Sequence, residues 1–163
     1  MSTPADTAQN RAASNADSAI RRIGVIGLGH MGSDFADNLI ADGYQVTVYD
    51  LNEKHIAALV AKGATGATRL RDIAGCEAVL TSLPDDHALT EVTLGDGGLI
   101  HVLTPAIHIS MSTVSPGLSR SLAQQHGLAG QGYVAAPVLG NPDLAQARKL
   151  FIISSSRDRV GAF

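Results

Sequence analysis

The sequence lacks several features that mark whole classes of protein, and these absences narrow its function. Among its 163 residues Cys76 is the single cysteine, so no internal disulfide can form. This fits a reducing cytoplasm, with Cys76 as a buried structural thiol. Lysine and arginine number 12 against 15 acidic residues, the formal net charge is −3, and no basic cluster occurs. We therefore expect neither a nucleic-acid partner nor attachment to an anionic membrane surface.

Long apolar runs and metal-binding patterns are missing as well. No apolar run approaches the roughly 20 residues that span a bilayer, so we expect no membrane segment. The six histidines show no H-E-x-x-H or other ligand spacing, so we expect no metal site. Residues 1–20 are small and polar without an apolar signal region, which predicts a disordered tail. Residues 21–163 are long enough for one domain with a sizeable core.

The most informative stretch that is present reads GLGHMG at residues 27–32. It follows an apolar run at 23–26 and opens a helical pattern, and Asp50 ends the next strand-like run at 45–49. This motif between a strand and a helix, with an acid about 20 residues on, is the dinucleotide-binding fingerprint. The alternative interpretation is a glycine-rich turn that merely joins a strand to a helix.

The fingerprint has a physical explanation at each glycine. Gly27 lets the chain turn sharply out of the strand, and Gly29 lets the backbone approach a pyrophosphate. Gly32 lets the helix pack close to the strand. The N-terminus of that helix then offers N–H groups and a partial positive charge to the phosphates.

Asp50 indicates which dinucleotide is preferred. A carboxylate at this point can accept hydrogen bonds from both hydroxyls of an adenosine ribose, and it repels the 2′-phosphate of NADP. The sequence therefore favours NAD, with NADP still possible because Lys54 and His55 could partly offset the charge. Alternatively, Asp50 caps the next helix or ends a strand in solvent.

Strand and helix patterns alternate along the chain. Strands are predicted at 22–27, 45–50, 78–83, 106–111, 133–136 and 150–154, with a short segment at 64–67. Helices are predicted at 31–42, 52–62, 86–93, 116–125 and after Asn141-Pro142, with a helical turn at 69–74. The alternation predicts an α/β fold of Rossmann type, a doubly wound, mostly parallel sheet with helices on both faces.

The loops that follow the strands should converge on one rim of this sheet, where ligands bind in such folds. They are residues 27–32, Asp50, 83–84, 112–113 and 138–141. Each of the last three could instead be an ordinary loop between a strand and a helix.

Five landmarks stand in order along residues 22–155. They are IGVIGLGHMG at 23–32, Asn38-Leu39, Leu83-Pro84, STVSP at 112–116, and Ala136-Pro137-Val138 with Gly140. In these the chain resembles the 3-hydroxyisobutyrate dehydrogenase family, the β-hydroxyacid dehydrogenases, whose relatives include imine reductases and 6-phosphogluconate dehydrogenase.

The resemblance implies a role for each landmark. Leu28, His30 and Met31 would wrap the pyrophosphate loop together with the three glycines. Leu83, Pro84 and Thr113 would approach the ribose and nicotinamide half of the cofactor, and Ser112, Gly140 and Asn141 would face the substrate. The expected cofactor-binding residues are thus Gly27, Leu28, Gly29, His30, Met31, Gly32, Asp50, Leu83, Pro84 and Thr113.

The chain also departs from the family. Ser110 stands where the family usually has Asp, residues 139–141 read Leu-Gly-Asn instead of Ser-Gly-Gly, and Arg148 replaces an expected glycine. The family continues into a second, mostly helical domain that holds the catalytic lysine and most of the dimer interface. We expect that domain to be absent from this chain. Its only lysines lie outside any matching motif, so we expect no catalytic residue; they are Lys54, Lys62 and Lys149.

Two classes of function stay open. In the first, the chain is the cofactor domain of an NAD(P)-dependent oxidoreductase that acts on a small hydroxy acid, carbonyl or imine by hydride transfer. Such a domain would be inactive alone, would meet its small-molecule substrate only when a second domain completes the cleft, and could form a homo-oligomer. In the second, it is a non-catalytic module that senses NAD(H) or regulates a partner, or a degenerate remnant.

Overall fold

The computed structural model describes residues 20–155. The disordered tail predicted at 1–20 lies outside the described residues, apart from Ile20. Within the described part, no helix combines the length and the apolar character that crossing a membrane requires.

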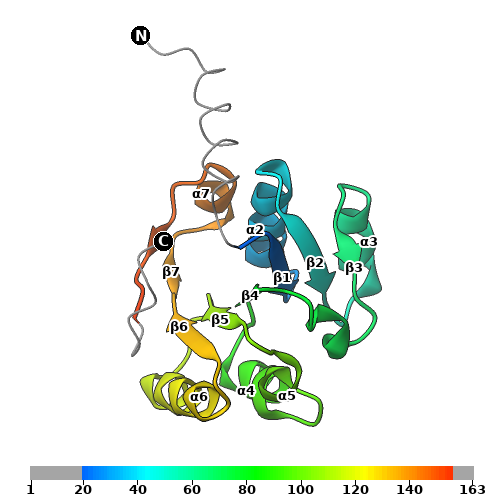
Figure 1. The fold of residues 1–163 in the computed structure, drawn as a ribbon. Coiled ribbons are helices and arrows are strands. Elements are labelled where there is room, and N and C mark those ends of the chain that lie inside the picture. The colour runs from blue at the N-terminus through cyan, green and yellow to red at the C-terminus, as the bar shows by residue number, and fades with distance from the viewer. Residues whose placement is uncertain (1–19, 156–163) are drawn as a thin grey trace.

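Six parallel strands form the central sheet, in the order β3-β2-β1-β4-β5-β6 (Figure 1). Because the chain starts in the middle of the sheet and builds outward in both directions, the predicted doubly wound fold is confirmed. Consecutive strands are joined by helical segments, as parallel pairing requires. The strands are β1 Arg22–Ile26, β2 Gln45–Tyr49, β3 Thr65–Gly66, β4 Ala78–Thr81, β5 Ile107–Ser110 and β6 Gly132–Ala135.

Helices cover both faces of the sheet. Helices α2 (His30–Ala41) and α3 (Glu53–Val60) pack on the face to which Ile23 and Val25 of β1 point. The other face carries the 3-10 helix η1 (Leu70–Ile73) with α4 (Asp86–Leu94), α5 (Leu99–Val102) and α6 (Pro116–Leu128). Figure 1 shows α4, α5 and α6 together in its lower part. Strand β1 is therefore apolar on both faces, as a central parallel strand should be.

Side-chain caps start four of the helices, at the positions that the sequence indicates. In each, a side-chain oxygen accepts a hydrogen bond from a backbone N–H in the first turn. These bonds satisfy donors that a helix start leaves unpaired. The caps are Asn52 for α3, Asp85 for α4, Ser115 for α6, and Asn141 for α7 (Pro142–Gln146).

The last predicted strand forms, but it does not join the parallel ladder. Strand β8 (Phe151–Ile152) pairs antiparallel with β7 (Val138–Leu139), and Ser155 makes an antiparallel bridge to Ala135. Only residues 140–150 separate β7 from β8, and a parallel return needs a crossover of about a dozen residues or more. The short connection therefore turns the chain back beside its own path. Strand β7 and helix α5 were not predicted from the sequence.

Candidate functional site

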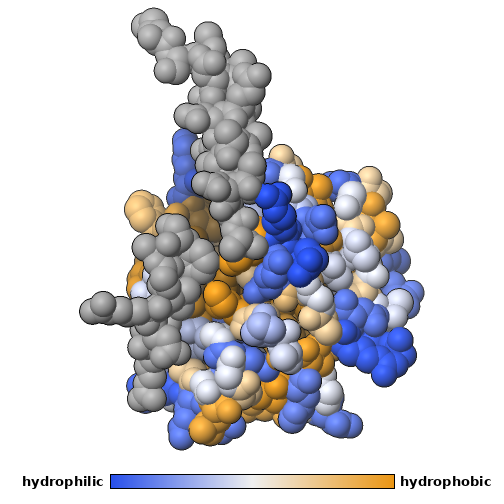
Figure 2. Space-filling model, viewed as in Figure 1, coloured by the Kyte–Doolittle hydropathy of each residue, from blue (hydrophilic) through white to orange (hydrophobic). Residues whose placement is uncertain are grey.

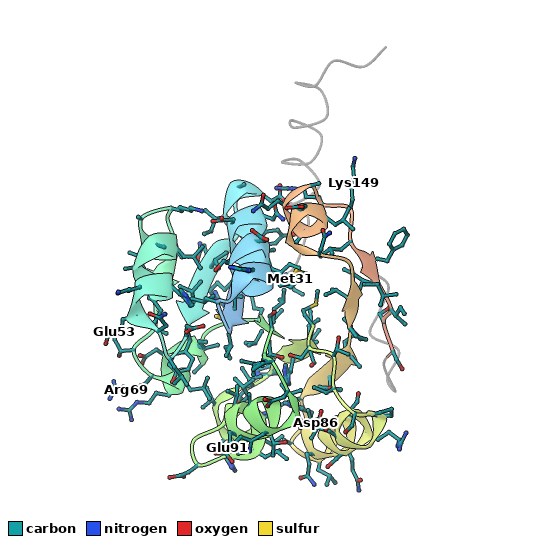
Figure 3. The ribbon with its side chains drawn as sticks, turned by 180° about the vertical axis from the view of Figure 1, so that it is seen from behind. Met31, Glu53, Arg69, Asp86, Glu91 and Lys149 are labelled. Atoms are coloured by element: carbon teal, nitrogen blue, oxygen red, sulfur yellow. The ribbon has the colours of Figure 1, made fainter. Side chains whose placement is uncertain are left out.

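A cleft of about 1000 Å³ opens at the carboxyl ends of β1, β2 and β4. Strands β1 and β4 are neighbours from which the chain winds in opposite directions, and ligands of doubly wound sheets bind at such a point. Its walls come from the glycine loop, the ends of β2 and β4, and one face of α4. Met31 at the start of α2 and Glu91 on α4 both line it, and Figure 3 labels both.

Two glycines bring α2 close to the sheet. Gly27 has φ +83°, and a Cβ placed there would lie 2.3 Å from the carbonyl oxygen of Ser82. A Cβ on Gly32 would lie 1.8 Å from the carbonyl oxygen of Gly27. No side chain fits at either position, so the sharp turn and the close helix-to-strand packing predicted for these residues are both present.

Gly29 plays a different part in the same loop. It is the N-cap of α2, it is exposed, and a Cβ built on it would meet no atom within 4 Å. No side chain caps the start of α2, and its first turn contains no acidic residue. The N–H groups of that turn are therefore left for an anion in the cleft. This arrangement fits the pyrophosphate of a dinucleotide.

Asp50 connects the end of β2 to the glycine loop. One carboxylate oxygen, Oδ2, accepts a hydrogen bond from the backbone N–H of Leu28 at 2.6 Å. The other, Oδ1, accepts from the N–H of Asn52 at 2.7 Å and lies 3.5 Å from Nδ1 of His55. Asn52 caps α3, so Asp50 is not that cap. A carboxylate has about four acceptor sites, so Asp50, which lines the cleft, retains capacity for ribose hydroxyls.

The turn after β4 forms the opposite wall. Leu83 and Pro84 line the cleft as predicted. Ser112 is buried and does not line it; its Oγ accepts from the N–H of Leu83 at 2.8 Å and donates to the carbonyl of Thr81 at 3.5 Å. The hydroxyl expected to face substrate therefore positions the turn that carries Leu83.

The remaining predicted residues lie away from the cleft lining. Leu28 and Gly32 are buried beneath the glycine loop. Thr113 is exposed beyond the end of β5. Gly140 (φ +150°) and Asn141 are exposed between β7 and α7, where Asn141 accepts from the N–H of Leu144 as the helix cap. The structure thus brings seven of the ten expected cofactor-binding residues to the cleft lining, and leaves Leu28, Gly32, Thr113 and the expected substrate residues outside it.

Several lining residues were not identified from the sequence. On the side of Asp50, the cleft is also lined by Tyr49, Leu51, His55 and Leu70. On the other side, α4 contributes His87, Ala88, Glu91 and Val92. Positions i, i+1, i+4 and i+5 form one stripe along a helix, so this spacing directly after Leu83-Pro84 is a signal that could have found the α4 wall.

A chain of buried hydrogen bonds starts at Thr81, at the end of β4 behind the cleft. Oγ1 of Thr81 lies 2.9 Å from Nε2 of His108, whose Nδ1 lies 2.9 Å from Nε2 of His126. Nδ1 of His126 lies 2.7 Å from Oε1 of Gln131, whose amide donates to the carbonyl of Leu103. Because Gln131 donates from its amide nitrogen, its Oε1 accepts from Nδ1–H of His126. Burial favours the neutral form of both rings, and with neutral rings this order of contacts places the proton of His108 on Nδ1 as well.

Burial determines the ionisation of these groups. It lowers the pKa of His108 well below 6.5, with a smaller contribution from His126, and it also lowers the pKa of His126. Burial likewise raises the pKa of the Cys76 thiol. The cysteine is buried as expected and stays a neutral structural group.

Neither a metal cluster nor a lysine is found at the cleft. Among residues 20–155, no three His, Cys, Asp or Glu side chains are grouped to hold a metal ion. Lys62 donates to Asp37 at 2.5 Å, and Lys54 and Lys149 are exposed. None of the three lines the cleft.

Comparison with known sequences places this geometry in a family. The family described as the NAD binding domain of 6-phosphogluconate dehydrogenase matches residues 22–161. The uncharacterized oxidoreductase YfjR of Bacillus subtilis is 43% identical over 136 residues, 82% of this chain and 48% of that protein. The 3-hydroxyisobutyrate dehydrogenase of Pseudomonas aeruginosa is 36% identical over 133 residues, 80% of this chain and 45% of that enzyme. The chain spans about half the length of these relatives.

Solved structures agree with this placement. Psf3, in complex with NADP+ and 2-OPP, superposes with a TM-score of 0.80 at 25% identity, over 83% of this chain and 49% of Psf3. The likeness again covers about half of a longer protein.

Proposed function

Because the chain belongs to the family of NAD-binding domains typified by 6-phosphogluconate dehydrogenase, we propose that it is the cofactor domain of an oxidoreductase. The complete enzyme transfers a hydride to or from a small hydroxy acid, carbonyl or imine. Residues 21–163 form the dinucleotide-binding unit of that enzyme. The observation that carries the proposal is the uncapped start of α2, which opens into the cleft at Gly29.

The described residues divide the work of holding the dinucleotide. Residues 27–32 hold the pyrophosphate, through backbone N–H groups and the positive end of α2. Asp50 accepts hydrogen bonds from the adenosine ribose. Leu83 and Pro84 flank the nicotinamide half, and Thr113 approaches it from the end of β5. When bound, the reduced cofactor supplies the hydride.

Asp50 also favours NAD(H) over NADP(H). Its carboxylate lies at the cleft, where it would repel a 2′-phosphate through like charge. Psf3 holds NADP+, so both cofactors have to be compared directly on this chain.

The proposed substrate class is supported by the named relatives more than by the residues that line this cleft. The likeness to 3-hydroxyisobutyrate dehydrogenase supports a small hydroxy acid, and an imine is the alternative. Gly140 and Asn141 would meet the substrate from the β7–α7 turn, and Ser112 would act indirectly through Leu83. With one cysteine in the whole chain, we assign this function to the cytoplasm, which cell fractionation can test.

Fluorescence titration with NADH tests the proposal. Gly29→Val places a branched side chain in the space meant for the pyrophosphate, and should abolish binding. The backbone at Gly29 (φ −62°, ψ −170°) tolerates a side chain, so the circular dichroism spectrum should not change. The matched control is Gly127→Val, at another glycine with open space, near the end of α6; it should keep wild-type affinity. Unchanged NADH affinity in Gly29→Val would show that the loop is only a structural turn.

A non-catalytic NAD(H)-binding module is the second candidate. The observation that favours it is that no lysine lines the cleft, so no general acid of the expected type is at hand. An assay of turnover separates the two functions and is described in the Discussion.

A further inference from the structure

The cleft at the glycine loop lies over one side of the sheet. In the strand order, β1 and β2 lie on one side of β4, and β5 and β6 lie on the other (Figure 1). All lining residues of the cleft fall between Ile26 and Leu70 or between Ser82 and Gly97. Among the described residues, therefore, none from β5, β6 or the turns after them lines this cleft.

The lining residues match the adenosine diphosphate part of a dinucleotide. The uncapped start of α2 fits the pyrophosphate, and Asp50 retains acceptor sites for ribose hydroxyls. Apolar side chains line the cleft as well. They include Leu51, which is 92% exposed, and Ala88 and Val92, which lie one turn apart on α4. An adenine base is flat and its faces are apolar, so walls of this kind suit it.

The described residues enclose the nicotinamide half much less. Of the residues expected to meet it, Leu83 and Pro84 line the cleft, whereas Thr113 is exposed outside the lining. Ser112 is 5% exposed, and its hydroxyl accepts a hydrogen bond from the N–H of Leu83 at 2.8 Å. That hydroxyl is therefore engaged within the protein. A nicotinamide ring beside Leu83 would lie against one wall and keep water on its other face.

We propose that the cleft of this chain is a site for molecules that carry an adenosine 5′-diphosphate group, and that it binds ADP-ribose, NAD+ and NADH with nearly equal affinity. The inference rests on the proposed binding of a dinucleotide in this cleft, and it names the part of the ligand that supplies the affinity. A group that stays largely in water contributes little to binding. In the second candidate function, the chain would then respond to the amount of these ligands and not to their redox state.

Isothermal titration calorimetry on the wild-type chain tests the inference. ADP-ribose has the same pyrophosphate charge as NADH and differs by lacking the nicotinamide, so the two form a matched pair. Their dissociation constants should agree within about threefold, and reduced nicotinamide mononucleotide should show no binding. The fluorescence anisotropy of NADH should rise on binding. Its emission maximum should stay at the value in water, because the ring remains hydrated.

A variant in the shared half checks the assignment. Asp50→Ala should weaken NADH and ADP-ribose by the same factor, at least about tenfold, because a charged hydrogen-bond acceptor for the ribose is lost. Asp143→Asn is the matched control. It removes one negative charge from the exposed first turn of α7, outside the cleft lining, and should leave both dissociation constants unchanged.

The outcomes separate this inference from the function on which it rests. A preference for NADH over ADP-ribose of more than about threefold would show that the nicotinamide is bound, and would overturn the inference while leaving dinucleotide binding intact. A loss in Asp50→Ala that is confined to NADH would do the same. If neither NADH nor ADP-ribose binds to the folded wild-type chain, the proposed function itself is wrong.

Discussion

At the scale of single residues, two backbone positions show how the chain meets geometric demands. Gly32 lies in α2, and its missing side chain lets this helix approach the carbonyl oxygen of Gly27. Arg148, where the resemblance predicted a glycine, is the one non-glycine residue with positive φ (57°) in the described part. Its guanidinium binds both carboxylate oxygens of Asp42, at 2.8 and 2.7 Å. The arginine thus combines backbone strain with a bidentate ion pair.

Gly32→Ala should destabilise the protein by about 2–3 kcal/mol, because the new methyl group has no room and α2 must move. In urea unfolding, the control Gly127→Ala should be neutral or stabilising by about 0.5–1 kcal/mol, the ordinary gain from alanine in a helix. Its added Cβ meets no atom within 4 Å. Equal stability of Gly32→Ala and wild type would contradict the close packing.

At Arg148, two substitutions separate the strain from the ion pair. Arg148→Ala loses the contacts to Asp42 and keeps the left-handed backbone, whereas Arg148→Gly loses the contacts and relieves the strain. We expect Arg148→Ala to be less stable than Arg148→Gly by about 1 kcal/mol in urea unfolding. The reverse order would show that the backbone at this position is not strained.

At the scale of elements, polar contacts tie the helices of the second face to the sheet and to one another. His126 of α6 bonds to His108 of β5 and, through Gln131, to the carbonyl after α5. Asp86 at the start of α4 accepts from the N–H of Ser115 at the start of α6. The hydrogen bonds from Ser115 lower the pKa of the Asp86 carboxyl group.

The two buried histidines predict a loss of stability in mild acid. Burial lowers their pKa in the folded state, so below about pH 6.5 the unfolded chain binds protons that the folded chain refuses. Stability should be complete above that pH and decline below it, by up to about 1.4 kcal/mol per pH unit for each histidine. The decline ends once the folded-state pKa is passed.

Urea unfolding between about pH 8 and pH 5.5 measures this slope, above the range in which carboxyl groups titrate. The double variant His108→Gln/His126→Gln should be less stable near neutral pH and should lose most of the slope. An equal slope in the variant would assign the acid sensitivity to other groups.

Local sequence signals found most of the elements and half of the site. The caps at Asn52, Asp85, Ser115 and Asn141 are local, so the helix starts were predictable. Helix α5 has four residues, too few for a periodic pattern to show. The antiparallel direction of β8 depends on tertiary pairing with β7.

The site shows the same difference between local sequence signals and contacts between distant residues. The glycine loop and Asp50 lie in one continuous motif, and the structure brings them to the cleft. The hydrogen bond from Leu83 to Ser112 spans 29 residues, and that between His108 and His126 spans 18. Nothing in a linear pattern indicates which distant polar groups will meet, so these roles could not be predicted.

At the scale of the whole molecule, the edge beyond β6 carries exposed apolar side chains. Figure 2 shows apolar surface at its left edge, over the segment from α7 to β8. Exposed apolar side chains that lie close together favour association with another protein surface. The exposed residues are Leu139 (56%), Phe151 (72%), Ile152 (55%) and Ile153 (58%).

We predict that the isolated chain self-associates through this edge. Size-exclusion chromatography with light scattering should show a mass above that of the monomer, which falls in the double variant Phe151→Ser/Ile153→Ser. Leu128→Ser is the control, because Leu128 is 78% exposed on α6. A monomer at all concentrations would refute this prediction.

We also predict no dehydrogenase turnover from the isolated chain. The cleft can hold a cofactor, but no lysine lines it to move the proton that accompanies hydride transfer. NADH oxidation is measured with small 2-oxo and 3-oxo acids, semialdehydes and cyclic imines, against Gly29→Val as background. Turnover well above that background would require a catalytic residue that is not evident in the described cleft.

The contact between α2 and α7 has a consequence for folding during protein synthesis. Arg148 reaches Asp42 across 106 residues of sequence, and Asn38 reaches the carbonyl of Ala145 across 107. The ribosome releases α2 long before α7 is synthesised, so the flank of α2 that will contact α7 is uncovered during that time. Closing so long a loop costs entropy before any contact repays it. The contact between α2 and α7 therefore forms only after residues 142–148 have been synthesised.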